Sequence, residues 1–322
     1  MVDRTRELLC IWKIELEQNF DGSGRENSIK DSERKLRGAV DTPYIITGPE
    51  QTFRQSGQKL LHNVNLKKQL SLFLLREWKN DHYLKLLAGK TLFVSYGGKC
   101  YKYVPDYECQ SITVEEPTYL QGNHEEADTL IAFHVANITG DVVVRASDTD
   151  VLVILIGALG NLQPENRAIR TVIIDCGSGN NRRYINVTNI VNNLEDLKPG
   201  LSRAMPGYHA FTGCDFTSAF FRKGKLKPLN IIEKDDTDLF VKFLISLGNR
   251  SSHVDIETAS EFVCRIYGQR KTRDTNEARY LKLMEMSGNI MGTKSHSQED
   301  NTEAESSDEA WSEESEDSDQ ED

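Results

Sequence analysis

The stretch VVVRASDTDVL, Val142–Leu152, joins two apolar runs through a short acidic segment. Asp141–Arg145 and Val151–Ile156 are almost continuously β-branched or aliphatic, a pattern typical of buried parallel strands. Asp148 and Asp150 lie between the two runs, where the chain must bend. We therefore expect strands over 141–145 and 151–156, with two carboxylates at the carboxyl end of the first.

Outward from this stretch, helical and strand-like patterns alternate. Apolar residues at helical spacing within 65–87 predict an amphipathic helix with a basic face. Residues 171–175 and 183–187 flank Gly177-Ser178-Gly179-Asn180 and predict a hairpin. Helices alternating with apolar strands indicate an α/β fold with a site at the carboxyl ends of the strands. The other expected elements are a basic helix over 29–37, a strand over 91–96, and helices over 125–135, 187–194, 239–247 and 257–267.

Acidic residues are concentrated at the C-terminal end. Glu299–Asp322 holds 13 Asp and Glu, no Lys or Arg, and Trp311 as its only large apolar residue. Such a segment buries too little apolar surface to offset chain entropy, so we expect it to be disordered. Removing these 13 acids from the chain's 50 leaves 37, against 39 Lys and Arg, so the net charge of −11 comes from the tail. We expect one domain over residues 1–295 and a disordered acidic tail over 296–322.

Secretory and membrane signals are not found in the sequence. No apolar run approaches the roughly 18 residues of a membrane span, and the first residues have no signal-peptide core. The six cysteines show neither CxxC nor Cys/His ligand spacing, which indicates reduced thiols. The sequence predicts an intracellular protein, nuclear in preference to cytoplasmic, with no membrane partner.

Acidic residues also occur where carboxylates can converge. Glu126 and Asp128 open an expected helix, Asp148 and Asp150 follow a strand, and Asp215 lies in a Thr-Gly-Cys-Asp turn. Carboxylates a few ångströms apart resist joint ionisation unless a cation neutralises them. Hard oxygen ligands suit Mg²⁺ or Mn²⁺, and two such ions can activate a water and stabilise the leaving oxygen of a phosphodiester. Taken singly, each group is more simply a solvated turn or a helix cap.

Several ordered segments resemble the internal region of the flap endonuclease/XPG family, most closely a mobile-element-like animal branch of it. The likeness covers a motif core over residues 20–228, with a divergent helical insertion at about 40–121. The segments that carry it are NHEEADTL (123–130), VVVRASDTDVL (142–152), HAFTGCD (209–215), and Phe20-Asp21-Gly22 with Lys30 and Arg37 downstream.

The resemblance implies a PIN-like parallel sheet flanked by helices and a divalent-metal-dependent, structure-selective nuclease. Lys30 and Arg37 would be catalytic, steering the scissile phosphate toward the ions. The implied partner is nucleic acid, DNA in preference to RNA. The implied ligands of two Mg²⁺ or Mn²⁺ ions are Asp21, Glu126, Asp128, Asp148, Asp150 and Asp215.

Two features depart from the family pattern. Family members begin with a strand that carries a metal-binding Asp far ahead of the Phe-Asp-Gly turn, whereas only nineteen residues precede Phe20 here, so we expect the first strand to be missing. The family's Gly-x-Gly-Lys hairpin, which binds the duplex backbone through main-chain amides, is replaced by Arg222-Lys223-Gly224-Lys225. The basic side chains that could still contact phosphates, unless they form a solvated loop, are Arg222, Lys223, Lys225 and Lys227.

The sequence leaves two functions open. A nearly complete motif set favours a nuclease, impaired if the N-terminal strand is truncated. The missing strand favours the alternative, a non-catalytic, element-derived relic of the same fold that binds nucleic acid or protein. Gly177 and Gly179 do not open a helix, so a phosphate loop is a poor interpretation. Cys214 is more simply a small core residue than a nucleophile paired with His209.

Overall fold

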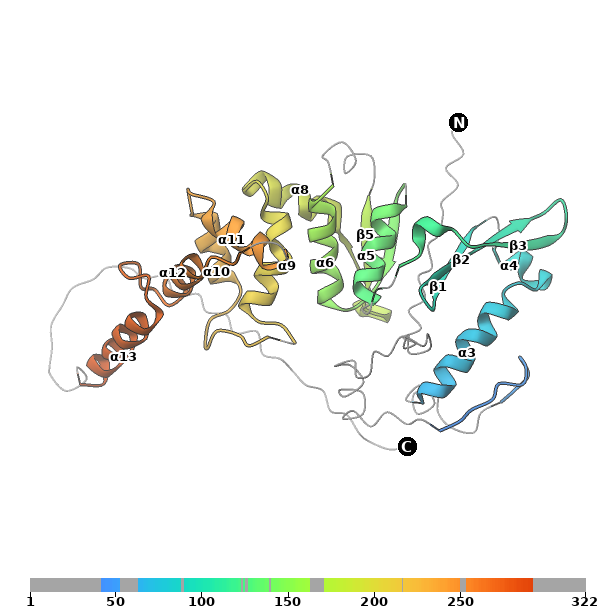
Figure 1. Ribbon diagram of the computed structural model, residues 1–322, viewed down its shortest axis with the longest axis horizontal. Coiled ribbons are helices and arrows are strands. Elements are labelled where there is room, and N and C mark those ends of the chain that lie inside the picture. Colours follow the sequence, from blue (N-terminus) through green and yellow to red (C-terminus); the bar gives the residue numbers. More distant parts are fainter. Residues whose placement is uncertain are drawn as a thin grey trace.

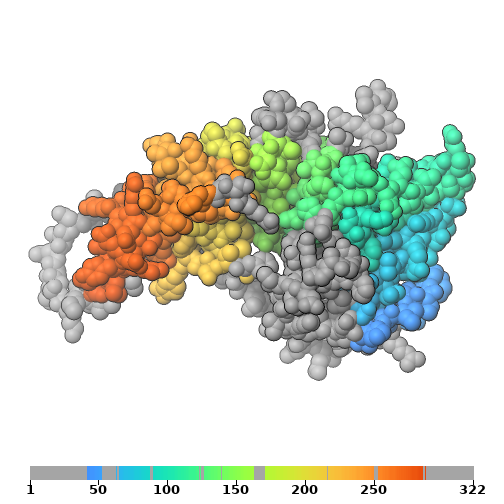
Figure 2. All heavy atoms as spheres, in the orientation of Figure 1, coloured from blue at the N-terminus to red at the C-terminus, as the bar shows by residue number. Residues whose placement is uncertain are grey.

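A computed structural model describes residues 42–52, 63–87, 90–122, 124, 127–138, 140–162, 171–215, 217–249 and 253–291. Its elements follow one long axis, with an antiparallel sheet at one end, an α/β unit in the middle and a group of helices at the other end (Figures 1 and 2). Several expectations fall outside the described residues. These are the Phe20-Asp21-Gly22 turn, the basic helix over 29–37, the missing first strand and the acidic tail over 296–322.

The central sheet is mixed. Strand β4 (Val142–Arg145) pairs in parallel with β5 (Val172–Cys176), and β5 pairs antiparallel with β6 (Arg183–Asn186). The predicted hairpin around Gly177 is therefore confirmed, while the expectation of a parallel sheet holds only for the β4–β5 pair. The register places Arg145 beside Asp175, and Asp175 beside Tyr184 on the other side.

The second predicted strand is wrong, because residues 151–156 lie in helix α6 (Thr149–Gly160). A short continuous apolar run fits a buried helix as well as a buried strand, so periodicity alone cannot separate them. Asp148 favours the helix, since its Oδ1 accepts a hydrogen bond from the backbone N–H of Asp150 at 2.9 Å and caps the first turn. Most apolar residues of α6 are then buried, with Leu155 fully inaccessible to solvent, while Leu152 and Ile154 are partly buried.

Helix α6 lies in the core between its neighbours. One cluster joins it to the sheet, to α5 (Ala127–Asn137) and to α8 (Val187–Leu197). It also packs closely on α9 (Leu201–Thr212), because a Cβ on Gly157 or Gly160 would collide with Pro206 or Ser202 of that helix. This packing holds the start of α6 near the end of α9.

A helical core continues from α9 toward the C-terminal end. Phe240, Phe243 and Phe262 are buried here, and Phe211 of α9 lies against the last two. The expected helices over 187–194, 239–247 and 257–267 are confirmed as α8, α11 and α12. The helices of this part are α10 (Leu226–Glu233), α11 (Leu239–Leu247), α12 (Ile256–Ile266) and the protruding α13 (Thr275–Met291).

The region expected to be a divergent helical insertion is a mixture of helix and sheet. The amphipathic helix is present as α3, but an antiparallel three-stranded sheet follows it, since residues 92–115 are rich in the β-branched and aromatic residues that favour strands. The hydroxyl of Tyr103 donates to the Leu75 carbonyl at 2.8 Å and fastens the sheet to α3. The elements are α3 (Val64–Glu77), η1 (Asp81–Tyr83), α4 (Leu84–Leu87), β1 (Leu92–Tyr96), β2 (Lys99–Asp106), β3 (Ser111–Glu115) and η2 (Thr118–Leu120).

One buried contact connects this antiparallel sheet to the central unit. The Ser95 hydroxyl on β1 lies 2.9 Å from Nε2 of His134, a fully buried residue of α5. Within the part of the chain that the structure describes, no helix is long and apolar enough to cross a membrane.

Candidate functional site

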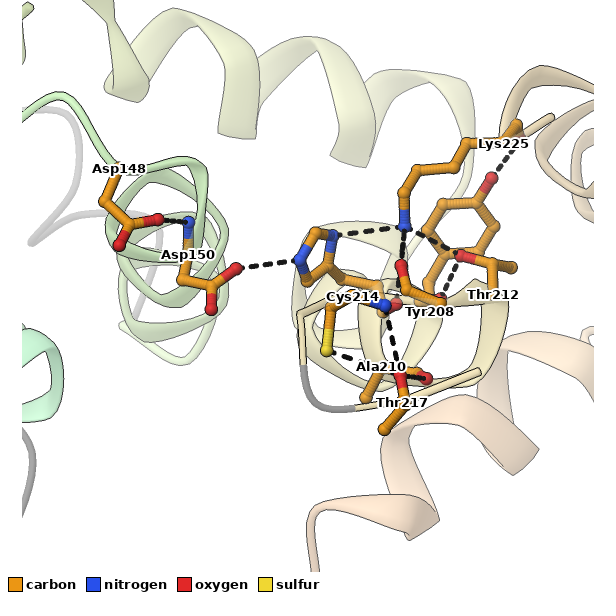
Figure 3. A network of polar contacts seen from close by, with 10 residues as sticks. Asp148, Asp150, Tyr208, Ala210, Thr212, Cys214, Thr217 and Lys225 are labelled. Atoms are coloured by element: carbon orange, nitrogen blue, oxygen red, sulfur yellow. Dashed lines mark hydrogen bonds and ion pairs between the residues drawn. The ribbon is translucent and has the colours of Figure 1, made fainter. Parts of the chain in front are cut away.

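The segment after β4 places two acids at the start of α6. Asp148 is the N-cap residue and is exposed, whereas Asp150 is partly buried in the first turn. The strand end and the cap therefore explain why the Asp-Thr-Asp sequence forms a bend. The two carboxylates diverge: that of Asp148 turns back to its own helix, and that of Asp150 points across to α9 (Figure 3).

The carboxylate of Asp150 meets an imidazole of α9. Its Oδ1 lies 2.9 Å from Nε2 of His209, in the last turn of that helix. The other ring nitrogen, Nδ1, lies 3.4 Å from the ammonium of Lys225. An ammonium can only donate, so Nδ1 accepts and Nε2–H donates to Asp150. This arrangement holds His209 in one tautomer, with the proton on Nε2.

Lys225 also completes the C-terminal end of α9. Its ammonium also contacts the carbonyls of His209 and Gly213 and the hydroxyl of Thr212, so two of its four acceptors share one of the three N–H groups. The negative end of a helix favours a cation at this place. Lys225 keeps some exposed surface, but partial burial of the ammonium lowers its pKa from the usual lysine value. A phosphate contact from Lys225 would have to replace these hydrogen bonds.

The turn that carries Asp215 depends on the glycine before it. Gly213 has a φ of +110°, and a Cβ there would lie 2.6 Å from Cα of Ala219. Cys214 and Thr217 then close the turn with paired backbone hydrogen bonds of 3.2 and 3.3 Å. Asp215 is exposed at the tip, directly after α9. The thiol of Cys214 contacts the Thr217 hydroxyl at 3.3 Å, while both nitrogens of His209 are engaged elsewhere, so no Cys–His pair forms.

A second charged cluster lies at the carboxyl ends of β4 and β5. Asp175 is buried and accepts hydrogen bonds from Arg145 at 2.9 Å and from Arg182 at 2.8 and 2.7 Å. The hydrogen bonds from Arg182, with the charge of Arg145, hold the pKa of Asp175 below its usual value. The sequence interpretation missed this cluster, although Arg145 and Asp175 both end predicted strands, which is the same signal that singled out Asp148.

The basic loop before α10 has separate parts. Arg222 adopts a left-handed φ of +52°, as a glycine would at this position, and its guanidinium lies 5.1 Å from the ring of exposed Phe221. The ammonium of Lys223 lies 5.8 Å from the ring of Tyr267. Burial, and to a smaller degree the neighbouring Lys223, lowers the pKa of Lys227.

No protein-family model, curated protein or solved structure matches this chain. The resemblance to the flap endonuclease/XPG family therefore stays a prediction, carried by the ordered segments of the sequence.

The metal site stays a prediction as well. Among the described residues, no three His, Cys, Asp or Glu side chains are grouped so that they could hold a metal ion. Asp128, in the first turn of α5, and the exposed Asp148 and Asp215 thus do not complete a site with Asp150. By themselves the described acids do not fit the expected two-ion centre. Asp21, Glu126, Lys30 and Arg37 lie outside the described residues.

Proposed function

We propose that this protein is a divalent-metal-dependent nuclease that cleaves phosphodiester bonds, in DNA in preference to RNA. The observation that carries the proposal is the contact between Asp150 and His209. It joins the Asp-Thr-Asp segment after β4 to the end of α9, which leads directly into the Gly213-Cys214-Asp215 turn. Two acidic segments far apart in the sequence are thereby drawn toward each other.

Basic side chains lie close to the acidic segments, where they can attract a polyanion such as nucleic acid. Lys225 contacts His209, so the loop that carries Arg222 and Lys223 ends beside the histidine that binds Asp150. A basic surface next to carboxylates can hold a phosphodiester near the groups that act on it. His209 orients Asp150, and Lys225 sets the tautomer of His209.

The proposed cofactor is Mg²⁺ or Mn²⁺, which would supply an activated water and neutralise charge on the phosphate. Asp148 and Asp150 are the described residues best placed to contribute ligands, since one oxygen of each carboxylate has no hydrogen-bond partner within the described part of the chain. Asp215, Asp128, Asp21 and Glu126 are the further candidates that the family resemblance implies.

The second candidate is a non-catalytic protein of the same fold that binds nucleic acid. The observation that favours it is the chain from Asp150 through His209 to Lys225, in which the protein's own cation balances the carboxylate. A site balanced in this way has less need of a bound metal ion.

Cleavage of labelled DNA, single-stranded and with a flap, in the presence of Mg²⁺ or Mn²⁺ tests the first candidate against the second. Asp148→Asn should abolish cleavage while keeping the helix cap, because asparagine caps as well as aspartate. Asp255→Asn is the control, since Asp255 caps α12 through the same kind of bond at 3.0 Å, accepts further bonds from Thr258, and lies in another part of the chain. Binding without cleavage would support the second candidate, and neither binding nor cleavage would contradict both.

A further inference from the structure

The cluster around Asp175 brings two arginines from different elements onto one buried carboxylate. Arg145 ends β4, and Arg182 comes from the loop between β5 and β6. Arg182 binds Asp175 in a bidentate manner through Nε and Nη2, and Arg145 donates through Nη1 to Oδ1. The side chain of Asp175 is 8% exposed, whereas those of Arg145 and Arg182 are 54% and 52% exposed.

This arrangement leaves positive charge facing solvent. One carboxylate cannot balance two guanidinium groups, and together they carry more N–H donors than one carboxylate can accept. One arginine bound to Asp175 would be enough to hold the loop between β5 and β6 against strand β5, so a purely structural role does not explain the second arginine. Asp175 stays ionised and holds both planar groups in place, so part of the entropy of ordering them is already spent before an anion binds.

An exposed aromatic ring accompanies the arginines. Tyr184 is the cross-strand neighbour of Asp175 on β6 and is 62% exposed. The guanidinium of Arg182 lies 5.4 Å from the centre of its ring. Arginine and an exposed aromatic side chain together are typical of surfaces that bind unpaired nucleic-acid strands, where phosphates meet the cation and bases stack on the ring.

The cluster is a neighbour of the Asp-Thr-Asp segment. Arg145 donates to the carbonyl of Gly177, and the N–H of the same glycine faces the hydroxyl of Ser147 at 3.5 Å. Gly177 has a φ of +75°, and a Cβ there would collide with the carbonyl of Asn181, so the loop is tightly folded. Ser147 directly precedes Asp148, so Gly177 contacts Arg145 through its carbonyl and the residue before the acids through its N–H.

We propose that Arg145 and Arg182 bind a backbone phosphate of an unpaired nucleic-acid strand beside Asp148, with Asp175 as the residue that positions both guanidinium groups. The proposal rests on the proposed function, because it specifies where that nucleic acid lies. It adds a phosphate site on the sheet side of the acids, apart from the basic loop before α10.

Fluorescence anisotropy of a labelled single-stranded oligonucleotide in EDTA tests the site without cleavage. Arg182→Gln should weaken binding by about fivefold to tenfold and reduce the slope of log affinity against log salt by about 0.7. Arg279→Gln is the matched control, because Arg279 is exposed on α13 and the charge change is the same. Asp175→Asn should also weaken binding while keeping the salt slope, because both guanidinium groups remain but lose the carboxylate that positions them.

Thermal unfolding shows whether each variant is folded. If Arg182→Gln does not fold, Arg182→Lys replaces it in the binding experiment. The lysine variant keeps the charge but loses the bidentate geometry, so it should keep the salt slope and bind less tightly. If the natural chain binds DNA and a folded Arg182 variant binds it with the same affinity, this inference is wrong, while the proposed function is unaffected. A natural chain that binds no strand would contradict the proposed function itself. Displacement of the strand by adenosine monophosphate at equal phosphate concentration would assign the arginines to a free nucleotide instead and also overturn the inference.

Discussion

Nε2 of His209 lies 2.9 Å from Oδ1 of Asp150, and this hydrogen bond connects the first turn of α6 to the last turn of α9. The two residues are 59 positions apart in the sequence. Because Lys225 occupies the other ring nitrogen, the imidazole is held from both sides. The helix pair and the basic loop thus share one polar connection at the end where the acidic segments meet.

Removing the imidazole should loosen this connection. His209→Ala should lower the free energy of unfolding by about 1–2 kcal/mol, because the partly buried Asp150 and Lys225 both lose a partner. His209→Gln should recover part of the loss, since its amide can donate to Asp150. Chemical denaturation provides the measurement, with His253→Ala, an exposed histidine, as the control. Equal stability of the natural chain and His209→Ala would show that the hydrogen bond does not hold the helices together.

The stability of the fold should fall as the medium becomes acidic. Burial lowers the pKa of His134 from 6.5 to about 4, and its buried Nδ1 has no hydrogen-bond partner among the residues that the structure describes. Below pH 6.5 this histidine becomes protonated in the unfolded chain but stays neutral in the folded chain until the pH reaches about 4. Stability is therefore lost as the pH falls from 6.5 to about 4 and does not change further below the folded-state pKa. The loss from this group should be about 2–3 kcal/mol.

His134→Gln isolates this effect from the titration of the carboxylates. Glutamine can keep the contact with Ser95 and does not titrate, so the variant should lose less stability between pH 7 and pH 4.5 than the natural chain. Denaturation midpoints measured across this range give the difference. Parallel pH profiles for the two proteins would contradict a neutral, buried His134.

Gly213 should be indispensable for the turn that carries Asp215. Gly213→Ala should cost about 1–3 kcal/mol, because alanine is strained at a φ of +110° and its Cβ would crowd Ala219. Gly224→Ala is the matched control, since a Cβ there would meet no atom within 4 Å. Thermal unfolding compares the two variants, and similar losses in both would exclude a special role for the conformation of Gly213.

Proline substitution tests where helix α6 begins after Asp148. Thr149→Pro should change stability by less than about 1 kcal/mol, because Thr149 is the first residue of α6, where proline is tolerated. Ile154→Pro should cost at least about 3 kcal/mol, since it removes a hydrogen bond in the middle of the helix. Circular dichroism and denaturation measure both, and a large loss from Thr149→Pro would argue against this helix boundary.

Local sequence patterns determined much of the secondary structure. Strand β4, the hairpin of β5 and β6, and helices α8, α11 and α12 lie close to their predicted ranges. Each of these elements is bounded by turn residues or has one buried and one exposed face, so neighbouring residues contain the signal. The same patterns located Asp148 and Asp150 in the segment that follows β4, although it leads into helix α6 instead of a second strand.

Only the tertiary structure decided the helical state of residues 151–156 and the partners of the charged groups. A run that is apolar on all sides has no period, so its conformation depends on what surrounds it, here α5, α8 and α9. The partner of Asp150 is likewise determined by the close packing of α6 on α9, which Gly157 permits. Asp175 meets Arg145 because β4 and β5 pair in parallel, 30 residues apart. Such contacts form between side chains that are distant in sequence, and their geometry exists only once the core is packed.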